Sequence, residues 1–179
     1  MKALLIIDMQ KGSFKPYSLR HDTLGTVERI NAVAKHCRDN NIPVIFIQHD
    51  GSNEQHFFPG SEDWELLPEL EVHSGDLMVS KTANDAFYKT RLDTLLKDKN
   101  ITELLISGCA TDFCIDTTVK SAHNKDYKVT VLADAHTTAS RPFVDAPTLI
   151  NHYNWLWNDL SPTRYKIAVV KTNEVVVLP

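Results

Sequence analysis

Short apolar runs alternate with helical patterns along most of this chain, and this alternation restricts its fold more than any other feature. Runs that are apolar throughout and as long as one strand are typical of strands buried on both faces. We predict strands at Ala3–Ile7, Val44–Ile47, Leu77–Ser80, Leu104–Ser107 and Val129–Leu132, with one or two more at Ile167–Val170 and Val175–Val177. Apolar residues at helical spacing predict helices at Thr23–Asn40, Thr90–Asn100 and Ala146–Leu156, and a further helix after Cys114.

Strands that alternate with helices predict an α/β fold of three layers. In this fold a mostly parallel, Rossmann-like sheet of about six strands is covered by helices on both faces. A length of 179 residues is typical of one domain, so we predict a single domain over residues 1–179.

Polar or conformationally free residues directly follow three of the predicted strands. Asp8 follows the first strand, Lys81 follows the third, and Gly108 follows the fourth. Ligands of parallel sheets bind at the carboxyl ends of the strands, near the point where the strand order reverses. If these strands are neighbours, the three positions converge on one cleft.

The segment Gly108–Thr118 carries the chain from a strand into a helix, with Cys114 at or near the helix start. There the helix dipole and any nearby cation favour the thiolate, the nucleophilic form of cysteine. Alone, Asp8 and Lys81 are better explained as solvated ends of strands, and Cys114 as a small buried apolar residue. Together, a cysteine, a lysine that lowers its pKa and an aspartate that accepts its proton are what a thiol nucleophile needs.

Composition excludes several other classes of function. The net charge of −4 does not favour binding to nucleic acid or to an acidic membrane surface. No apolar run approaches membrane-spanning length, and Ala3–Ile7 is too short and too soon followed by an acidic residue for a signal peptide. Cys37, Cys109 and Cys114 have no metal-ligand spacing and suit a reducing compartment. We therefore expect a cytoplasmic protein with a small-molecule substrate and neither a nucleic-acid nor a membrane partner.

Three blocks of sequence, in order along the chain, resemble the signature blocks of the isochorismatase-like cysteine hydrolases. They are Leu5–Gln10, Ser80-Lys81 ahead of Asp85–Phe87, and Gly108–Cys114. This superfamily includes nicotinamidases and carbamoylsarcosine amidases. The resemblance spans nearly the whole chain and implies the isochorismatase-like hydrolase fold. It also implies that Asp8, Lys81 and Cys114 form a catalytic triad.

The same resemblance implies the reaction. It places a cis peptide bond between Cys109 and Ala110 and an oxyanion hole at the N–H groups of Ala110 and Cys114. A thioester would form on Cys114 as the C–N bond of a small amide or carbamoyl compound breaks, with no cofactor. Isochorismatases proper cleave a vinyl ether and lack the nucleophilic cysteine, so the presence of Cys114 favours an amide substrate.

Nicotinamidases add a metal site after the second strand, built from an Asp-x-His pair and a further histidine. Here Asp50 is followed by glycine and then Ser52, so the paired histidine is missing. We expect no metal. Whether the long loop Gly51–Gly75 binds one through Asp50, His56 or His73 stays open.

Five further residues are predicted to line the substrate pocket. Phe14, Trp64, Phe87 and Phe113 each lie beside a motif residue in the sequence, and His136 follows the fifth strand. Ordinary packing is the alternative for the aromatic residues, and an exposed or locally bonded histidine is the alternative for His136. Cys37 and Cys109 are predicted to lie in the core.

The resemblance also implies a homo-oligomer, a dimer or a tetramer. Asn151 and His152, together with Trp155 and Trp157, are candidates for the subunit contact. A helix packed on the sheet explains the same residues equally well. A neighbouring subunit that completes the pocket is a further open alternative.

Two other functions remain open at this point. One is a non-catalytic member of the fold that uses an exposed thiol of low pKa for binding or redox sensing. The other is an isochorismatase-type ether hydrolase, which releases pyruvate without needing Cys114.

Overall fold

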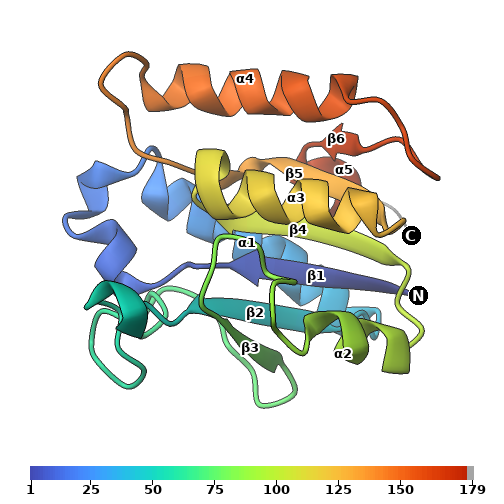
Figure 1. Ribbon diagram of the computed structural model, residues 1–179, viewed down its shortest axis with the longest axis horizontal. Coiled ribbons are helices and arrows are strands. Elements are labelled where there is room, and N and C mark those ends of the chain that lie inside the picture. The colour runs from blue at the N-terminus through green and yellow to red at the C-terminus, as the bar shows by residue number, and fades with distance from the viewer. Residues whose placement is uncertain (177–179) are drawn as a thin grey trace.

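Six parallel strands form one sheet in the order β3-β2-β1-β4-β5-β6 (Figure 1). The computed structural model describes residues 1–176 of the chain. The strands are β1 (Lys2–Ile7), β2 (Val44–His49), β3 (Leu77–Lys81), β4 (Glu103–Cys109), β5 (Lys128–Thr137) and β6 (Ala168–Val170). The predicted α/β class with a parallel sheet of about six strands is confirmed.

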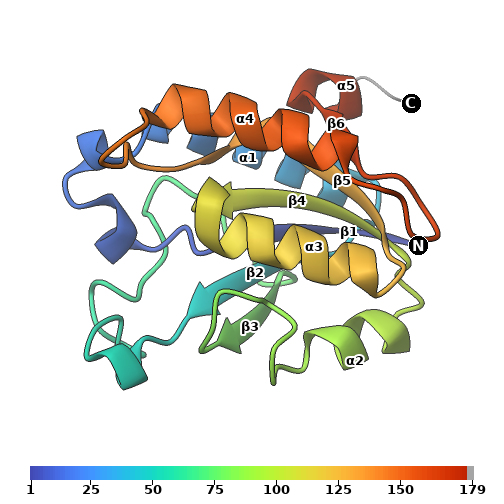
Figure 2. The same ribbon diagram turned by 45° about the horizontal axis from the view of Figure 1, so that its top comes forward.

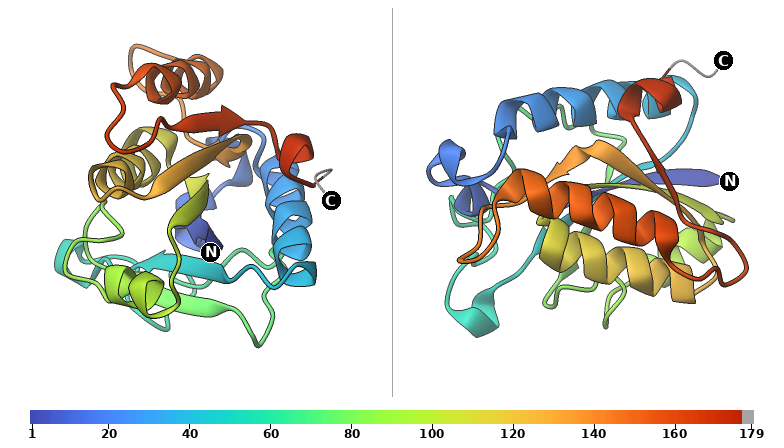
Figure 3. Two further views of the ribbon diagram at one scale, coloured as in Figure 1. Left: turned by 90° about the vertical axis from the view of Figure 1, so that its right-hand side faces the viewer. Right: turned by 90° about the horizontal axis from the view of Figure 1, so that it is seen from above.

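Helices cover both faces of this sheet. They are α1 (Thr23–Asp39), α2 (Leu92–Asp98), α3 (Asp116–Asn124), α4 (Ala146–Asp159) and α5 (Thr172–Val176). Helices α1 and α5 lie on one face, and α2, α3 and α4 lie on the other (Figure 3). No helix within residues 1–176 is both long and apolar enough to cross a bilayer.

Alternate residues of β1 enter two separate hydrophobic cores, which explains its unbroken apolar run. Ala3, Leu5 and Ile7 pack in the core beneath α2, α3 and α4. Leu4 and Ile6 pack in the core beneath α1. Each buried leucine or isoleucine side chain of β1 contributes about 1.5–3 kcal/mol of hydrophobic stabilisation, so a polar residue on either side of this strand would be costly.

The order of the strands reverses between β1 and β4. From that point β2 and β3 follow on one side, and β5 and β6 follow on the other. Ile7 pairs with Ile47 on β2 and with Gly108 on β4, and His49 pairs with Lys81 on β3. The four strand ends therefore meet at one edge of the sheet, where β4 leads toward α3 (Figure 2).

Strand β5 is longer than its sequence predicts. The expected strand stops at Leu132, but the observed strand continues through His136 to Thr137. Its register against β4 shifts between Ile106 and Gly108. An irregularity of this kind lets the strand bend and continue pairing, which a periodicity argument cannot anticipate.

The second predicted C-terminal strand is wrong for the residues that the structure describes. Val175 and Val176 belong to α5, and Val177 lies outside the described residues. Glu174 accepts a hydrogen bond from the Lys171 N–H at 2.8 Å. A glutamate that reaches back to the residue before the helix is half of a capping box, and this local contact outweighs the β propensity of valine.

Candidate active site

The ammonium group of Lys81 joins the three residues predicted to act together. Its Nζ lies 2.7 Å from Asp8 Oδ2 and 3.3 Å from Cys114 Sγ. The ammonium also donates to the Ala83 carbonyl at 2.9 Å. The Lys81 side chain is fully buried, so these three contacts take the place of water around its ammonium group. The structure thus places Asp8, Lys81 and Cys114 in one cluster.

Each member of this cluster reaches it from the end of a different element. Asp8 directly follows β1 and has a φ of +50°, a left-handed conformation that aspartate tolerates better than most residues. Lys81 is the last residue of β3. Cys114 lies in a π-helical turn, Thr111–Ile115, that leads directly into α3. Turns of this kind are frequent at functional sites.

Gly108 brings the turn that carries Cys114 close to β1. Its φ is +121°, and a Cβ atom there would overlap the carbonyl oxygen of Ile7. Only glycine fits this position, because it adopts positive φ freely and has no side chain to displace the neighbouring strand. The second peptide bond after Gly108, between Cys109 and Ala110, is cis.

The thiol of Cys114 is neutral at rest, which differs from the thiolate that the sequence suggests. Burial raises the pKa of Cys114, the Asp8 carboxylate raises it further, and the Lys81 ammonium lowers it only in part. Burial would lower the pKa of Lys81, but Asp8 and Cys114 outweigh it, so the pKa of Lys81 is raised and the ammonium stays charged.

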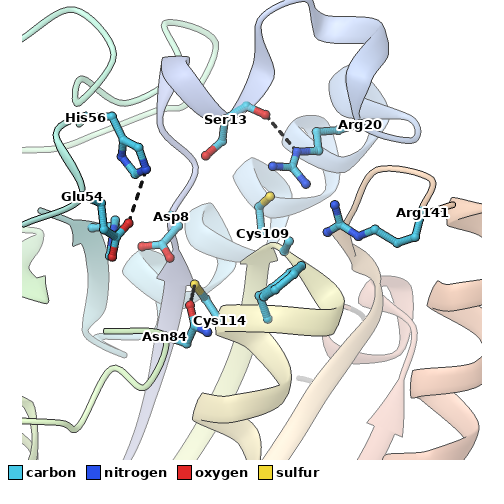
Figure 4. Close-up of a pocket in the computed structure, with 12 residues that line it drawn as sticks. Asp8, Ser13, Arg20, Glu54, His56, Asn84, Cys109, Cys114 and Arg141 are labelled. Atoms are coloured by element: carbon cyan, nitrogen blue, oxygen red, sulfur yellow. Dashed lines mark hydrogen bonds and ion pairs between the residues drawn. The ribbon is translucent and has the colours of Figure 1, made fainter. Parts of the chain in front are cut away.

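A cavity of about 210 Å³ opens over these residues at the carboxyl edge of the sheet (Figure 4). Asp8 and Cys114 lie at its centre, with the side-chain oxygen of Asn84 3.5 Å from Cys114 Sγ. The remaining lining residues are mostly polar or charged: Ser13, Arg20, His49, Glu54, His56, Cys109, Ala110, Phe113 and Arg141.

Of the four aromatic residues predicted to line the pocket, only Phe113 does so. Phe14 is fully buried in the core beneath α1. Phe87 packs in the opposite core and stacks on Tyr127. Trp64 does not line the cavity either, although its backbone carbonyl accepts hydrogen bonds from two glutamine side chains. Proximity in sequence failed here because neighbouring residues point to different sides of the chain.

His136 lies behind the nucleophile turn and does not reach the cavity. Its Nδ1 is 2.9 Å from Thr111 Oγ1, and its Nε2 is 2.9 Å from Asn154 Oδ1. Asn154 donates its amide to the Ala133 carbonyl, so its oxygen faces the ring and accepts from Nε2–H. Burial lowers the pKa of His136 to about 4. The neutral ring therefore connects Thr111 of the nucleophile turn to Asn154 of α4.

Several residues that line the cavity were not predicted from the sequence. Asn84 lies three residues after Lys81, and this closeness was a signal that the sequence offered. Arg20 and Arg141 lie in loops far apart in the sequence, and no local pattern distinguishes them from surface arginines. His49 directly precedes Asp50, and Glu54 lies two residues before His56, so both lie beside residues that were considered only as metal ligands.

The candidate metal ligands do not converge. Asp50 accepts a hydrogen bond from the Ser52 N–H at 3.0 Å, whereas His56 pairs with Glu54 at 3.3 Å. His73 lines a different cavity, beside Arg38. Among residues 1–176, no group of three or more histidine, cysteine or carboxylate side chains is arranged to hold a metal ion. The ligand geometry implied by nicotinamidases is therefore not met by these residues.

The residues proposed for a subunit contact divide between core and surface. Trp157 is fully buried, and its indole N–H donates to Asp116 at 2.9 Å, so it packs within the chain. Trp155 is 60% exposed. Asn151 and His152 are exposed as well. Cys37 and Cys109 are buried, as predicted.

Fold and site together define a parallel α/β protein with a cysteine-centred site at the switch point of its sheet. The Isochorismatase domain family matches residues 2–151, so the chain belongs to the isochorismatase family of hydrolases.

Three relatives illustrate the range of that similarity. An uncharacterized isochorismatase family protein of Bacillus subtilis is 29% identical over 136 residues, covering 75% of this chain and 72% of that protein. A streptothricin hydrolase of Streptomyces noursei is 28% identical, covering 79% of this chain and 56% of the relative. A ureidoacrylate amidohydrolase of Caulobacter segnis is 35% identical, covering 51% of this chain and 38% of the relative.

Solved structures show the same fold. A crystal structure of an isochorismatase family protein superposes with a TM-score of 0.87 at 28% identity, covering 95% of this chain and 98% of the other. A cysteine hydrolase from Pseudomonas syringae superposes with a TM-score of 0.88 at 24% identity, covering 98% and 90%. The second similarity establishes the fold alone.

Proposed function

We propose that this protein is a cysteine amidohydrolase that cleaves the C–N bond of a small amide or carbamoyl compound. The observation that carries the proposal is the contact of one buried ammonium, Lys81 Nζ, with both Asp8 and Cys114. A base, a cation and a thiol gathered at the floor of a cavity are the parts that nucleophilic acyl transfer needs. The names of the streptothricin hydrolase and the ureidoacrylate amidohydrolase agree with hydrolysis of this kind.

The first step follows from the raised pKa of the Cys114 thiol. A thiol that is neutral at rest must lose its proton as it attacks, and the Asp8 carboxylate is the base beside it. Sγ bonds to the carbonyl carbon of the substrate while Asp8 takes the proton. Lys81 remains charged and stabilises sulfur as it becomes negative and then the tetrahedral intermediate around it.

The second step releases the amine. The substrate oxygen becomes negative and accepts hydrogen bonds from the N–H groups of Ala110 and Cys114, which form the oxyanion hole. The Ala110 carbonyl accepts from the N–H groups of Phe113 and Ile115, and these bonds keep Ala110 next to the turn that carries Cys114. As the C–N bond breaks, protonated Asp8 gives its proton to the leaving nitrogen, and a thioester remains on Cys114.

The third step regenerates the enzyme. Asp8 is again a carboxylate, and it removes a proton from a water molecule that attacks the thioester. The C–S bond breaks, the thiol recovers its proton, and the carboxylic or carbamic acid departs. Each proton that Asp8 takes is thus returned within one turnover.

The raised pKa of Cys114 weighs against a redox-sensing role. Sensor cysteines are accessible thiolates of low pKa, because the thiolate is the form that oxidants attack. Cys114 is partly exposed, but burial and the neighbouring carboxylate disfavour its thiolate. The buried pair of Asp8 and Lys81 has a clear use in a hydrolase and none in a simple binding protein.

Ammonia release tests the proposal directly. A panel of small primary amides, ureido compounds and nicotinamide is incubated with the wild-type protein and with Cys114→Ala. We expect release from at least one substrate, reduced by about 10³-fold or more in the variant. Mass spectrometry of a rapidly quenched reaction should find the acyl group on Cys114.

Cys37→Ala is the matched control, because Cys37 lies on the buried face of α1, away from the cavity. It should retain turnover. Undiminished ammonia release by Cys114→Ala would disprove the mechanism, and pyruvate release from isochorismate by Cys114→Ala would establish the ether-hydrolase alternative.

A further inference from the structure

The side chain of Asn84 contacts the nucleophile, although the mechanism proposed for the triad gives it no part. Its Oδ1 lies 3.5 Å from Cys114 Sγ and accepts the hydrogen bond of the thiol. The residue is exposed and lines the cavity, and Figure 4 shows its amide beside the sulfur, with Asp8 on the opposite side. The sulfur therefore lies between a carboxylate and a neutral amide, and a bound substrate can reach both.

The backbone on either side of Asn84 is fixed by hydrogen bonds. Lys81 donates to the Ala83 carbonyl at 2.9 Å. The hydroxyl of Thr118, on α3, donates to the Asn84 carbonyl at 3.4 Å and accepts from the Ala86 N–H at 3.1 Å. These bonds use only backbone atoms of Asn84, so its side chain is positioned by the segment and is not needed to hold it. Such support is what keeps a functional group in a defined place.

The position of Oδ1 determines which part of a substrate it meets. A carbonyl carbon about to react lies about 3–3.5 Å from its nucleophile. Because Asn84 Oδ1 is 3.5 Å from the same sulfur, it lies within reach of a substituent of that carbon. The carbonyl oxygen is itself an acceptor and is repelled by Oδ1, and an apolar substituent would leave Oδ1 without a donor. An N–H group is the substituent that fits.

We infer that Asn84 Oδ1 accepts a hydrogen bond from the N–H of the leaving nitrogen, so that Asn84 selects amides over esters. This inference rests on the proposed function and deepens it. An ester has an oxygen in this place, and an amide nitrogen with two carbon substituents has no hydrogen. The substrate class is therefore a primary or monosubstituted amide or carbamoyl compound.

The same contact makes the thiol proton available to Asp8. A neutral thiol has one proton, which bonds to Asn84 Oδ1 while no substrate is bound. When the substrate N–H takes this acceptor, the S–H turns to the Asp8 carboxylate. Sγ then bonds to the carbonyl carbon as Asp8 takes the proton. When the C–N bond breaks, Asp8 returns that proton to the leaving nitrogen, which Asn84 holds with its lone pair toward Asp8.

Amides and esters of the same acid test this inference. The probe pairs are propionamide with methyl propionate and nicotinamide with methyl nicotinate, so only the leaving group differs within a pair. The proteins are the wild type, Asn84→Leu, which removes the acceptor at similar size, and Asn84→Asp, which keeps an acceptor oxygen. Asn158→Leu is the control, because Asn158 is exposed on α4 and does not line the cavity. The carboxylic acid product is measured by chromatography and gives kcat/KM for both members of a pair.

Asn84→Leu should lower kcat/KM for the amides by about 10- to 100-fold, the range expected when an N–H group loses its acceptor. The esters should change by no more than about 3-fold. Asn84→Asp should keep the wild-type ratio of amide to ester turnover within about 3-fold, because its added charge affects the thiol equally with both probes. Asn158→Leu should match the wild type. The urea midpoint of Asn84→Leu should also match, since the fold uses only the backbone of Asn84.

An Asn84→Leu variant that slows amide and ester by the same factor overturns the inference, because that pattern signals a general change in the site. Unchanged amide turnover in this variant, or a wild type that hydrolyses the esters and neither amide, overturns it as well. Failure of the proposed function looks different. Amide hydrolysis that persists in Cys114→Ala refutes the thiol mechanism, whatever ratio Asn84→Leu gives.

Discussion

Lys81 and Asp8 form an ion pair of 2.7 Å in which the lysine side chain is fully buried and the aspartate side chain is 7% exposed. The pair holds a positive charge 3.3 Å from the Cys114 sulfur without a net charge at the floor of the cavity. This arrangement links the stability of the fold to the chemistry of the site. Replacing either residue by a neutral one leaves the charge of the other buried without a counter-charge.

The first prediction concerns this pair. Lys81→Met should lower the free energy of unfolding by about 3–5 kcal/mol, because it leaves the Asp8 carboxylate buried without a counter-charge. Urea denaturation at pH 7 measures the change. The double variant Asp8→Asn, Lys81→Met should lose less stability than the sum of the two single variants. Additive losses would mean that the two charges do not depend on each other.

The second prediction separates the reactivity of the thiol from catalysis. Asp8 raises the pKa of Cys114, so Asp8→Asn should increase the thiolate fraction and accelerate alkylation by iodoacetamide at pH 8, by about 10-fold. Turnover should fall by about 10³-fold in the same variant because its base is gone. Peptide mapping checks that the label is on Cys114 and not on buried Cys37 or Cys109. Slower alkylation in Asp8→Asn would contradict the assigned role of Asp8.

The third prediction concerns the backbone before the nucleophile turn. Gly108→Ala should destabilise the protein by about 3 kcal/mol or more, because its φ of +121° is strained for alanine and the new Cβ would meet Ile7. Gly75→Ala is the control, since nothing lies within 4 Å of a Cβ atom at that position. Its midpoint of unfolding should stay near that of the wild type. Equal effects of the two substitutions would refute the close approach.

The fourth prediction is a pH dependence. The pKa of His136 is about 4 in the folded protein and about 6.5 in the unfolded chain, so only the unfolded state takes up a proton between these values. The contribution of neutral His136 to the free energy of unfolding is therefore complete above pH 6.5 and is lost as the pH falls toward 4. The loss by pH 4.5 is about 2–3 kcal/mol.

His136→Gln removes this group and provides the comparison. Carboxylates such as Asp112, whose pKa is lowered by Arg141 and Thr138 against the effect of burial, weaken the protein at low pH in both versions. The stability advantage of the wild type over His136→Gln should therefore shrink between pH 7 and pH 4.5 in urea denaturation. Parallel stability curves would show that His136 is not buried as a neutral ring.

Local pattern was enough to predict the sheet and the three central residues of the site. The apolar side chains of the run Ala3–Ile7 are all removed from water only when the strand is covered on both faces. This requirement can be recognised in the sequence itself. Asp8 and Lys81 interrupt such runs, so their positions at strand ends followed directly. Resemblance supplied the connection of these two residues to Cys114, which periodicity alone does not contain.

Tertiary structure decided what depends on neighbours distant in sequence. The raised pKa of Cys114 comes from burial and from Asp8, 106 positions away in the chain. Arg20 and Arg141 became one side of a cavity only when their loops met above the sheet. Burial, charge environment and the shape of a cavity depend on which surfaces of the chain come into contact. The order of residues along the chain does not reveal these contacts.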